Sequence, residues 1–478
     1  MITCAYCNKK NSQPCGLSEA GTRVRPVFAG RLSLTVNTRD DESRSAPRLN
    51  RAIGPWTLGA NAVNLSLGAG IFVLPATVAA ILGPAAIVAY LVCAIAIGLV
   101  LMCFVELGSR TVTSGGAVAY VEDAFGPTAG FVAWVVYSVG YCAVADAAIA
   151  NVLVDTVATT SPVVASGVWR VVALALVLGG LAAVNVLGVR QGARVAVATT
   201  AAKLLPLLVI LVGGAFMMHL RELRWVTWPT FTKIGEASLL LFFAFSGAEA
   251  AVTPGGEVQD PARTVPRGLL GGAGVLVLLY VSVQIVTQGV LGADIANHAD
   301  APLAAVSELL LGPAGRGVMV LCIALAIFGT LSADLLASPR AFLPMALDGV
   351  LPRRLGAIHP RFRTPHVAII TYATLIWVLA VSGAFKPLAI MSSVALLVVY
   401  LAVCLATLKL RVGRPPDPGT FKTPGGPFVP VVGVLVVLWL LAQSSWMEAG
   451  AMLATLAAAT GYYRIRSMVT TRRPERPS

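Results

Sequence analysis

The sequence predicts an all-α integral membrane protein with twelve transmembrane helices, of which the first and the sixth are broken near their middles. Hydrophobic residues make up 57% of the 478 residues and charged residues only 12%, too little charge to cover a soluble protein of this length. Twelve apolar runs follow one another, most of them near the ~20 residues that a bilayer crossing needs. Glycine-containing breaks interrupt the first and sixth runs.

The runs lie at about 52–82, 84–108, 128–157, 169–188, 195–218, 236–255, 268–292, 315–346, 365–384, 387–410, 428–446 and 448–465. The two breaks divide the first ten runs into two sets of five, and an odd number of spans inverts the second set relative to the first. We therefore expect a 5+5 inverted repeat, with repeat one at about 52–218 and repeat two at about 236–410. Two extra C-terminal helices at about 428–465 complete a membrane domain over 51–466.

The segments outside the runs predict tails and loops. Residues 1–50 are polar and basic without a signal peptide's apolar stretch, which indicates an uncleaved, disordered cytoplasmic tail. Residues 467–478 predict a short basic cytoplasmic tail. The segment 109–127 predicts a loop with a short surface helix, and 293–313 predicts a longer loop.

The net charge of +13 reports membrane topology rather than a nucleic-acid partner. When the spans are threaded with the N-terminus inside, most of the 35 lysines and arginines fall in cytoplasmic loops and tails, the bias that orients membrane proteins. No basic and aromatic module of a nucleic-acid-binding protein accompanies the charge. We expect a multi-pass protein of the cell (plasma or inner) membrane with both termini in the cytoplasm.

The first break is Gly68-Ala69-Gly70, preceded by Ser66 and followed by Ile71. Small residues in a membrane helix usually indicate close helix packing, and that interpretation stays open here. If the helix instead opens, the amides of Ala69, Gly70 and Ile71 form the N-terminus of a new half-helix. Free N–H groups at such an end bind anions, and a small carboxylate would suit this one.

The second break contains Phe243, Ser246 and Gly247. Opening this helix leaves the carbonyls of its first half without partners, and these attract an ammonium group. One break thus suits a carboxylate and the other an amine, which together describe the head group of an α-amino acid. Phe243 is expected to lie over that head group, although a lipid-facing aromatic residue is the alternative.

Four of the charged residues inside predicted spans are candidates for function, because ionisable groups within a membrane are costly and usually functional. Glu249 follows the second break and could carry a proton or brace the unwound backbone. Lys203 could replace a sodium ion, carry a proton, or extend its amine to the membrane surface. Asp334 could face a cationic substrate group or pair with Lys203, and Asp146 has no evident partner.

Tyr141 and Tyr137 sit one turn apart in the third span, where either a cavity or a core position is possible. The pattern Cys4-Ala-Tyr-Cys7 has the spacing of metal sites, but with Cys15 it offers three cysteines and no histidine. We expect neither a metal nor a cofactor. The sequence contains no GxSxG, HExxH or Walker A motif, so no enzyme activity is expected.

Five stretches in order resemble the amino acid–polyamine–organocation (APC) superfamily of amino-acid permeases. They cover roughly residues 50–465 and are Gly68-Ala69-Gly70-Ile71-Phe72; Glu106-Leu107-Gly108-Ser109-Arg110 with Ser114-Gly115-Gly116; Phe245-Ser246-Gly247-Ala248-Glu249; Glu257-Val258-Gln259-Asp260-Pro261-Ala262-Arg263 with Pro266-Arg267; and Ala346-Leu347-Asp348-Gly349-Val350-Leu351-Pro352. The resemblance implies a substrate bound between spans one, three, six and eight. It also implies that Phe243 takes the position of a gating aromatic residue, and Lys203 that of a sodium ion.

Two of the residues that depart from the family pattern belong to the expected binding site. Ala69 stands where relatives often carry serine, and Asp334 stands where several have a neutral or aromatic residue. The second departure favours a cationic amino acid or a polyamine. The substrate-binding residues expected are Ser66, Gly68, Ala69, Gly70, Ile71, Tyr141, Phe243, Ser246, Gly247 and Asp334, and those expected for proton coupling or gating are Lys203, Glu249 and Phe243.

The function expected is that of a secondary active transporter that moves an amino acid across the membrane by alternating access. It would be sodium-independent and either proton-coupled or an exchanger, with protons and the lipid bilayer as its other partners. Two alternatives stay open: a membrane protein that senses or binds an amino acid without transporting it, and an exchanger of polyamines or cationic amino acids.

Overall fold

The computed structural model describes residues 51–110, 114–188, 193–225, 227–299, 301–413 and 420–471, with the side chains of 193–202 and 469–471 excepted. The predicted N-terminal tail, with its three cysteines, lies outside these residues. Within them the chain is helical, and its one β contact is an isolated bridge between Ile53 and Val258.

The helices of the first half are α1 (Pro55–Ser66), α2 (Gly70–Leu82), α3 (Ala86–Arg110), α4 (Gly116–Phe125), α5 (Pro127–Val135), α6 (Val144–Ala158), α7 (Gly167–Val186), α8 (Ala193–Met217) and α9 (Phe231–Phe245). Those of the second half are α10 (Pro261–Leu291), α11 (Pro302–Leu311), α12 (Pro313–Ala337), α13 (Phe342–Leu347), α14 (His366–Ser382), α15 (Phe385–Gly413), α16 (Phe428–Leu441) and α17 (Trp446–Thr471). Short 3-10 turns lie at η1 (Gly83–Ala85), η3 (Pro162–Ala165), η4 (Leu220–Leu223), η5 (Ala248–Val252), η6 (Gly255–Glu257), η7 (Gly292–His298), η8 (Ser338–Ala341) and η9 (Arg353–Gly356), and a π-helical segment at η2 (Val136–Ala143).

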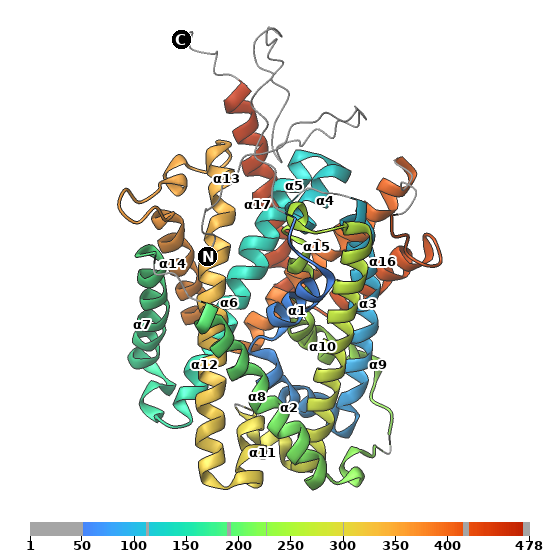
Figure 1. The fold of residues 1–478 in the computed structure, drawn as a ribbon, viewed down its shortest axis with the longest axis vertical. Coiled ribbons are helices and arrows are strands. Elements are labelled where there is room, and N and C mark those ends of the chain that lie inside the picture. Colours follow the sequence, from blue (N-terminus) through green and yellow to red (C-terminus); the bar gives the residue numbers. More distant parts are fainter. Residues whose placement is uncertain are drawn as a thin grey trace, which may run out of the picture.

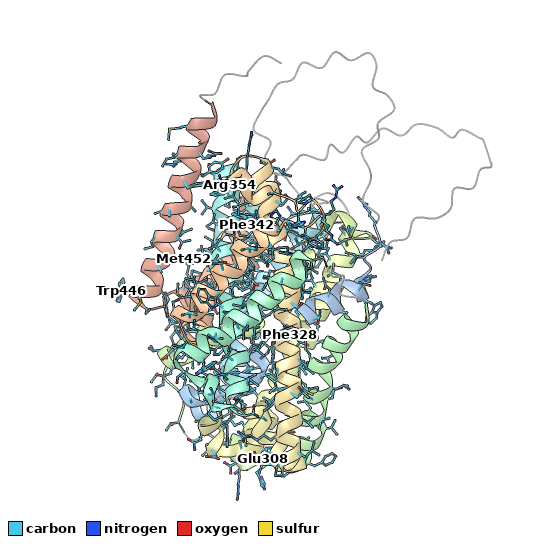
Figure 2. The ribbon with its side chains drawn as sticks, turned by 90° about the vertical axis from the view of Figure 1, so that its left-hand side faces the viewer. Glu308, Phe328, Phe342, Arg354, Trp446 and Met452 are labelled. Atoms are coloured by element: carbon cyan, nitrogen blue, oxygen red, sulfur yellow. The ribbon has the colours of Figure 1, made fainter. Side chains whose placement is uncertain are left out.

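Most of the long helices run along the length of the molecule, with α1 near its centre, α7 and α14 at one side and α16 at the other (Figure 1). Seven helical segments of the described chain are long and apolar enough to cross a membrane, and three shorter apolar helices accompany them. Helices α16 and α17 meet at a bend of 119°. The exposed Trp446 begins α17 and projects away from the body of the protein (Figure 2). The described chain is thus an all-helical membrane domain.

Two stretches differ from the sequence expectation. The predicted loop at 293–313 contains η7 and the ten-residue helix α11, whose buried face packs against α2, α8 and α12. Gly312, with a positive φ of 74°, and Pro313 then start α12. Because this Gly-Pro pair ends α11 after ten residues, α11 is too short to be found as a long apolar run. At the C-terminus, α17 continues past the expected end of the membrane domain at 466.

Helices α1 and α10 cross in close contact through glycines. A Cβ atom at Gly272 would lie 2.7 Å from the carbonyl oxygen of Gly59, and one at Gly59 would lie 2.9 Å from that of Gly268. Small residues spaced four apart let helix backbones approach this closely in membranes. The contact fixes α1 against α10 just before the chain reaches its first break.

A buried ion cluster joins α3 to α15 at one end of the bundle. Glu106 is fully buried and forms ion pairs with Arg110 and Arg411. The backbone amide of Thr423 donates to the same carboxylate at 3.0 Å. The cluster therefore holds the chain at Thr423, just before α16, against the end of α3.

Candidate functional site

The first span is interrupted where the sequence predicts it. Helix α1 ends at Ser66, α2 begins at Gly70, and the residues between them are not helical. Among the described residues, no backbone carbonyl accepts a hydrogen bond from the amides of Ala69, Gly70 and Ile71. These three donors are buried within the protein, at the N-terminus of α2. The geometry is that of an anion site at a helix N-terminus.

The carbonyl end of α1 has its own support. The Ser66 carbonyl accepts from the Gly68 amide at 2.8 Å and from the hydroxyl of Tyr280, on α10, at 2.8 Å. The Ser66 hydroxyl is buried and has no hydrogen-bond partner in the described chain. Ser66 therefore keeps one polar atom available beside the break.

The second interruption follows α9, which ends at Phe245. Gly247 adopts φ 103°, and the chain then forms the short turn η5. In the described chain, no backbone amide donates to the carbonyls of Phe242, Ala244 and Phe245. The Ser246 hydroxyl donates to the Phe243 carbonyl at 2.6 Å. This end of α9 is therefore rich in acceptors, as a site for an ammonium group requires.

The two breaks lie against each other. A Cβ atom at Gly247 would lie 2.9 Å from the carbonyl oxygen of Leu65, and one at Gly70 would lie 3.0 Å from Cβ of Ala244. Ile149 of α6 approaches Gly68 from the third span. Segments about 180 residues apart in sequence thus place unpaired donors next to unpaired acceptors.

Glu249 braces the second break. Its Oε2 accepts from the Gly247 amide at 2.9 Å and from the Tyr400 hydroxyl of α15 at 2.7 Å. The Tyr137 hydroxyl also interacts with this carboxylate. Two hydrogen bonds from separate elements therefore hold this buried carboxyl group beside the second break.

The third span reaches the site through a π-helical segment that the sequence analysis did not identify. Segment η2 carries Tyr137 and Tyr141, whose ring centroids are 5.3 Å apart. The Tyr141 hydroxyl is hydrogen-bonded to that of Ser246, so the two tyrosines face the second break. Single π turns often occur at functional sites because they re-aim side chains.

Phe243 lies one turn before the second break and is buried. Its ring packs edge-on against Phe385, the first residue of α15, with centroids 5.7 Å apart. The ring therefore faces protein rather than lipid, as a gating residue must.

Lys203 supports the end of α1 from α8. Its ammonium group donates to the Asn64 carbonyl at 3.3 Å and lies 3.5 Å from the Asn64 side-chain oxygen. Coulomb attraction links Lys203 with Asp334 of α12. Asp334 in turn lies beside Asp146 of α6, the acid to which sequence reasoning gave no partner. Its position inside an apolar run was the one signal that a partner had to exist.

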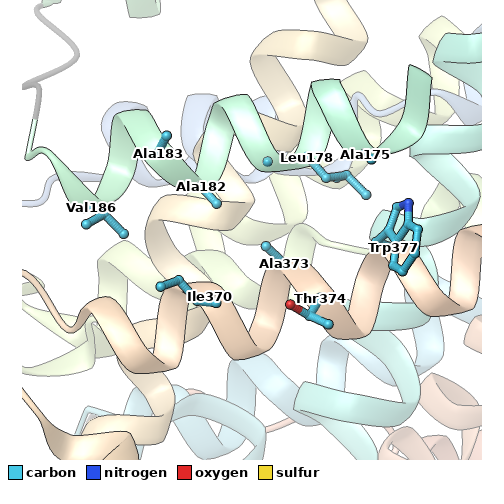
Figure 3. A pocket seen from close by; sticks show the side chains of 10 residues that line it. Ala175, Leu178, Ala182, Ala183, Val186, Ile370, Ala373, Thr374 and Trp377 are labelled. Carbon is cyan, nitrogen blue, oxygen red and sulfur yellow. The ribbon is translucent and has the colours of Figure 1, made fainter. Parts of the chain in front are cut away.

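Two hollows lie on the described surface, one distant from the site and one beside it. One, of about 550 Å³, lies between α7 and α14 and is lined by small apolar side chains with Thr374 and Trp377 (Figure 3). It has no charged lining residue and does not suit a zwitterion. The other, of about 530 Å³, lies between α1, α8 and α10, and Lys203, Asn64 and Arg267 line it. Lys203 thus borders this hollow behind the first break.

Comparison with known proteins agrees with this architecture. The amino acid permease family matches residues 53–463. A branched-chain amino acid permease of Bacillus subtilis is 24% identical over 423 residues, which cover 84% of this chain and 89% of the relative. A serine/threonine exchanger of the same organism is 25% identical over 384 residues, with 79% and 87% coverage. An uncharacterized transporter of Mycobacterium tuberculosis is 30% identical over 424 residues, with 85% and 89% coverage. The chain is therefore a multi-pass membrane protein that belongs to the amino acid permease family, a family of transporters rather than enzymes.

Proposed function

We propose that the protein is a secondary active transporter that carries an α-amino acid across the cell membrane by alternating access. The juxtaposed breaks of the first and sixth spans carry this proposal. A zwitterion satisfies both ends at once, because its carboxylate accepts from the free amides of α2 and its ammonium group donates to the free carbonyls of α9. The substrate-binding residues proposed are those of the two breaks with Tyr141 and Phe243.

The proposed topology is twelve spans in a five-plus-five inverted repeat with two added helices and both termini in the cytoplasm. The matching positions of the breaks support the repeat. The proposed domains remain a membrane domain at 51–466 with a cytoplasmic tail on either side.

Transport is proposed to be independent of sodium, with coupling to protons or exchange of amino acids. Lys203 supplies the positive charge beside the end of α1, where it donates to Asn64. A fixed ammonium group at this place takes the role that a bound cation would otherwise have.

The environment of Asp334 favours a neutral amino acid over a cationic one or a polyamine. Lys203 balances the negative charge of Asp334 electrostatically, and Asp146 lies beside it. A second cation at this acid would meet the repulsion of Lys203.

The test is uptake into proteoliposomes of radiolabelled L-leucine, L-arginine, L-glutamate and putrescine. Each is measured with and without sodium, with and without a pH gradient, and with and without unlabelled amino acid inside. We expect uptake of leucine without sodium, driven by the pH gradient or by the internal amino acid. If leucine binds but is not taken up under any of these conditions, the protein is a sensor and the proposed transport is wrong.

Replacing Glu249 by glutamine tests whether this acid braces the break. We expect a loss of uptake of about 10-fold, because hydrogen bonds to a charged acceptor contribute ~1.5–3 kcal/mol and the amide keeps part of them. The dependence of uptake on pH should keep its midpoint, since the proposed role is structural. A midpoint that moves or disappears would make Glu249 the proton carrier instead.

A further inference from the structure

A buried and a half-buried carboxyl group, those of Asp146 and Asp334, meet between α6 and α12. Asp146 is 3% exposed, and its carboxyl group lies close enough to that of Asp334 to share a hydrogen bond when one of the two carries a proton. The other contact of Asp146 is with Tyr372 of α14, whose hydroxyl donates to Asp146 Oδ2 at 2.8 Å. Three elements that are distant in sequence therefore converge on one pair of acids.

A hydrogen bond between two carboxyl groups requires a proton between them. An ionised carboxylate is only an acceptor, so two ionised groups cannot bond to each other. Like charges in contact inside a protein also repel strongly, and such pairs hold one proton in common. The pair therefore carries one proton and one negative charge.

The remaining charge of the pair faces Lys203. Coulomb attraction links Asp334 to Lys203, whose ammonium group contacts the last turn of α1 at Asn64. A continuous sequence of polar contacts and charge interactions thus runs from Tyr372 through Asp146, Asp334 and Lys203 to the broken span. A change of charge at the acid pair alters the attraction on Lys203 and, through its hydrogen bond to Asn64, the end of α1 at the first break.

Among the described residues, titratable groups on η2, α14 and α8 surround the pair. Cys142, Tyr137 and Tyr141 interact electrostatically with Asp334, and Cys142 also with Asp146. From α14 the facing group is Tyr372, and from α8 it is Lys203. Glu249 interacts with the three side chains of η2 and with Tyr400 of α15, so it belongs to the brace of the second break.

We propose that Asp146 and Asp334 together hold the proton that is released and taken up during transport, with Lys203 linking their charge to the opening of the first break. This inference rests on the proposed function and names the site of its coupling. Release of the proton to water breaks the hydrogen bond between the acids and leaves two carboxylates beside one ammonium group. The added negative charge draws Lys203 toward Asp334 and weakens its contact with Asn64, which frees the end of α1 to move.

The first experiment follows the proton directly in proteoliposomes by infrared spectroscopy. We expect the wild type to show a protonated carboxyl band that disappears as the pH is raised. The band should be missing in Asp146→Asn, where the remaining acid Asp334 faces Lys203 and is ionised, and retained in the matched control Asp294→Asn, which changes an exposed acid of η7. A band that persists in Asp146→Asn, or that is lost in Asp294→Asn, would overturn the proposal.

The second experiment follows uptake of radiolabelled L-leucine against pH. The wild type should lose about 10-fold per pH unit above its midpoint, as one titrating proton requires. Across the same range Asp146→Asn should change by less than about 2-fold, because one proton-sharing partner is gone. An unchanged profile in Asp146→Asn would contradict the pair as the coupling site.

Tyr372→Phe separates coupling from a structural role. Its hydroxyl stabilises the ionised form of Asp146, so without it the pair keeps its proton to higher pH. The uptake profile should therefore move to more alkaline pH with its slope unchanged. Loss of uptake without such a shift would make the pair structural. If the wild type takes up none of the tested amino acids, the proposed function fails, and the infrared band still decides where the proton is held.

Discussion

Replacing Gly247 by alanine is expected to lower uptake by on the order of 10–100-fold, because the second break cannot accept a side chain. Gly247 has φ 103°, a conformation that costs other residues about 1–3 kcal/mol, and each ~1.4 kcal/mol is 10-fold in an equilibrium. The added Cβ would also lie 2.9 Å from the Leu65 carbonyl oxygen and push the two breaks apart. The measurement is initial uptake into proteoliposomes at matched protein density.

The control for this variant is Gly274→Ala. Gly274 lies inside α10, and a Cβ there would have no atom within 4 Å. Alanine favours the helical conformation, so transport should be unchanged. If Gly247→Ala transports as well as this control, the close contact between the breaks is not part of the binding site.

Replacing Lys203 by alanine is expected to abolish most uptake and to change its dependence on pH. The substitution removes the donor to Asn64 at the end of α1 and leaves Asp334 without its balancing charge. Removing a charged hydrogen-bond donor costs about 1.5–3 kcal/mol, which corresponds to a decrease of about 10-fold or more. Uptake and its pH profile are measured together with the yield of folded protein.

Two companion variants separate folding from coupling. Lys386→Ala removes an exposed lysine near the start of α15 and should leave uptake unchanged. The double variant Lys203→Ala, Asp334→Asn removes both charges and should recover folded protein without recovering transport. Full activity of Lys203→Ala with an unchanged pH profile would contradict the role proposed for this lysine.

The two breaks were predictable because their signals are local. Gly68-Ala69-Gly70 and Ser246-Gly247 put small and polar residues where a membrane helix needs continuous hydrogen bonding, and the chain has to open or pack tightly there. The apolar runs likewise predicted the positions of the long helices, since bilayer thickness sets their length. The roles of the site residues stay predictions.

Features that depend on contacts between distant segments were not predictable. Asp146 and Asp334 lie on helices almost 190 residues apart, and nothing in either run indicates that they meet. Tyr280 and Tyr372 have the sequence context of ordinary core residues, and only the structure shows that their hydroxyls donate to Ser66 and Asp146. Segment η2 carries no charged residue and continues the pattern of its run, so a π turn leaves no mark in the hydrophobic pattern.

The most direct test of the binding site compares an amino acid with its two half-molecules. In proteoliposomes that take up a radiolabelled amino acid, the competitors are the same compound, the amine that lacks its carboxylate and the acid that lacks its amino group. Because each break binds one charged group, both analogues should compete about 10–100-fold more weakly than the amino acid, the loss expected when hydrogen bonds to a charged group are removed. Equal competition by either analogue would contradict a site built from the two breaks for a zwitterion.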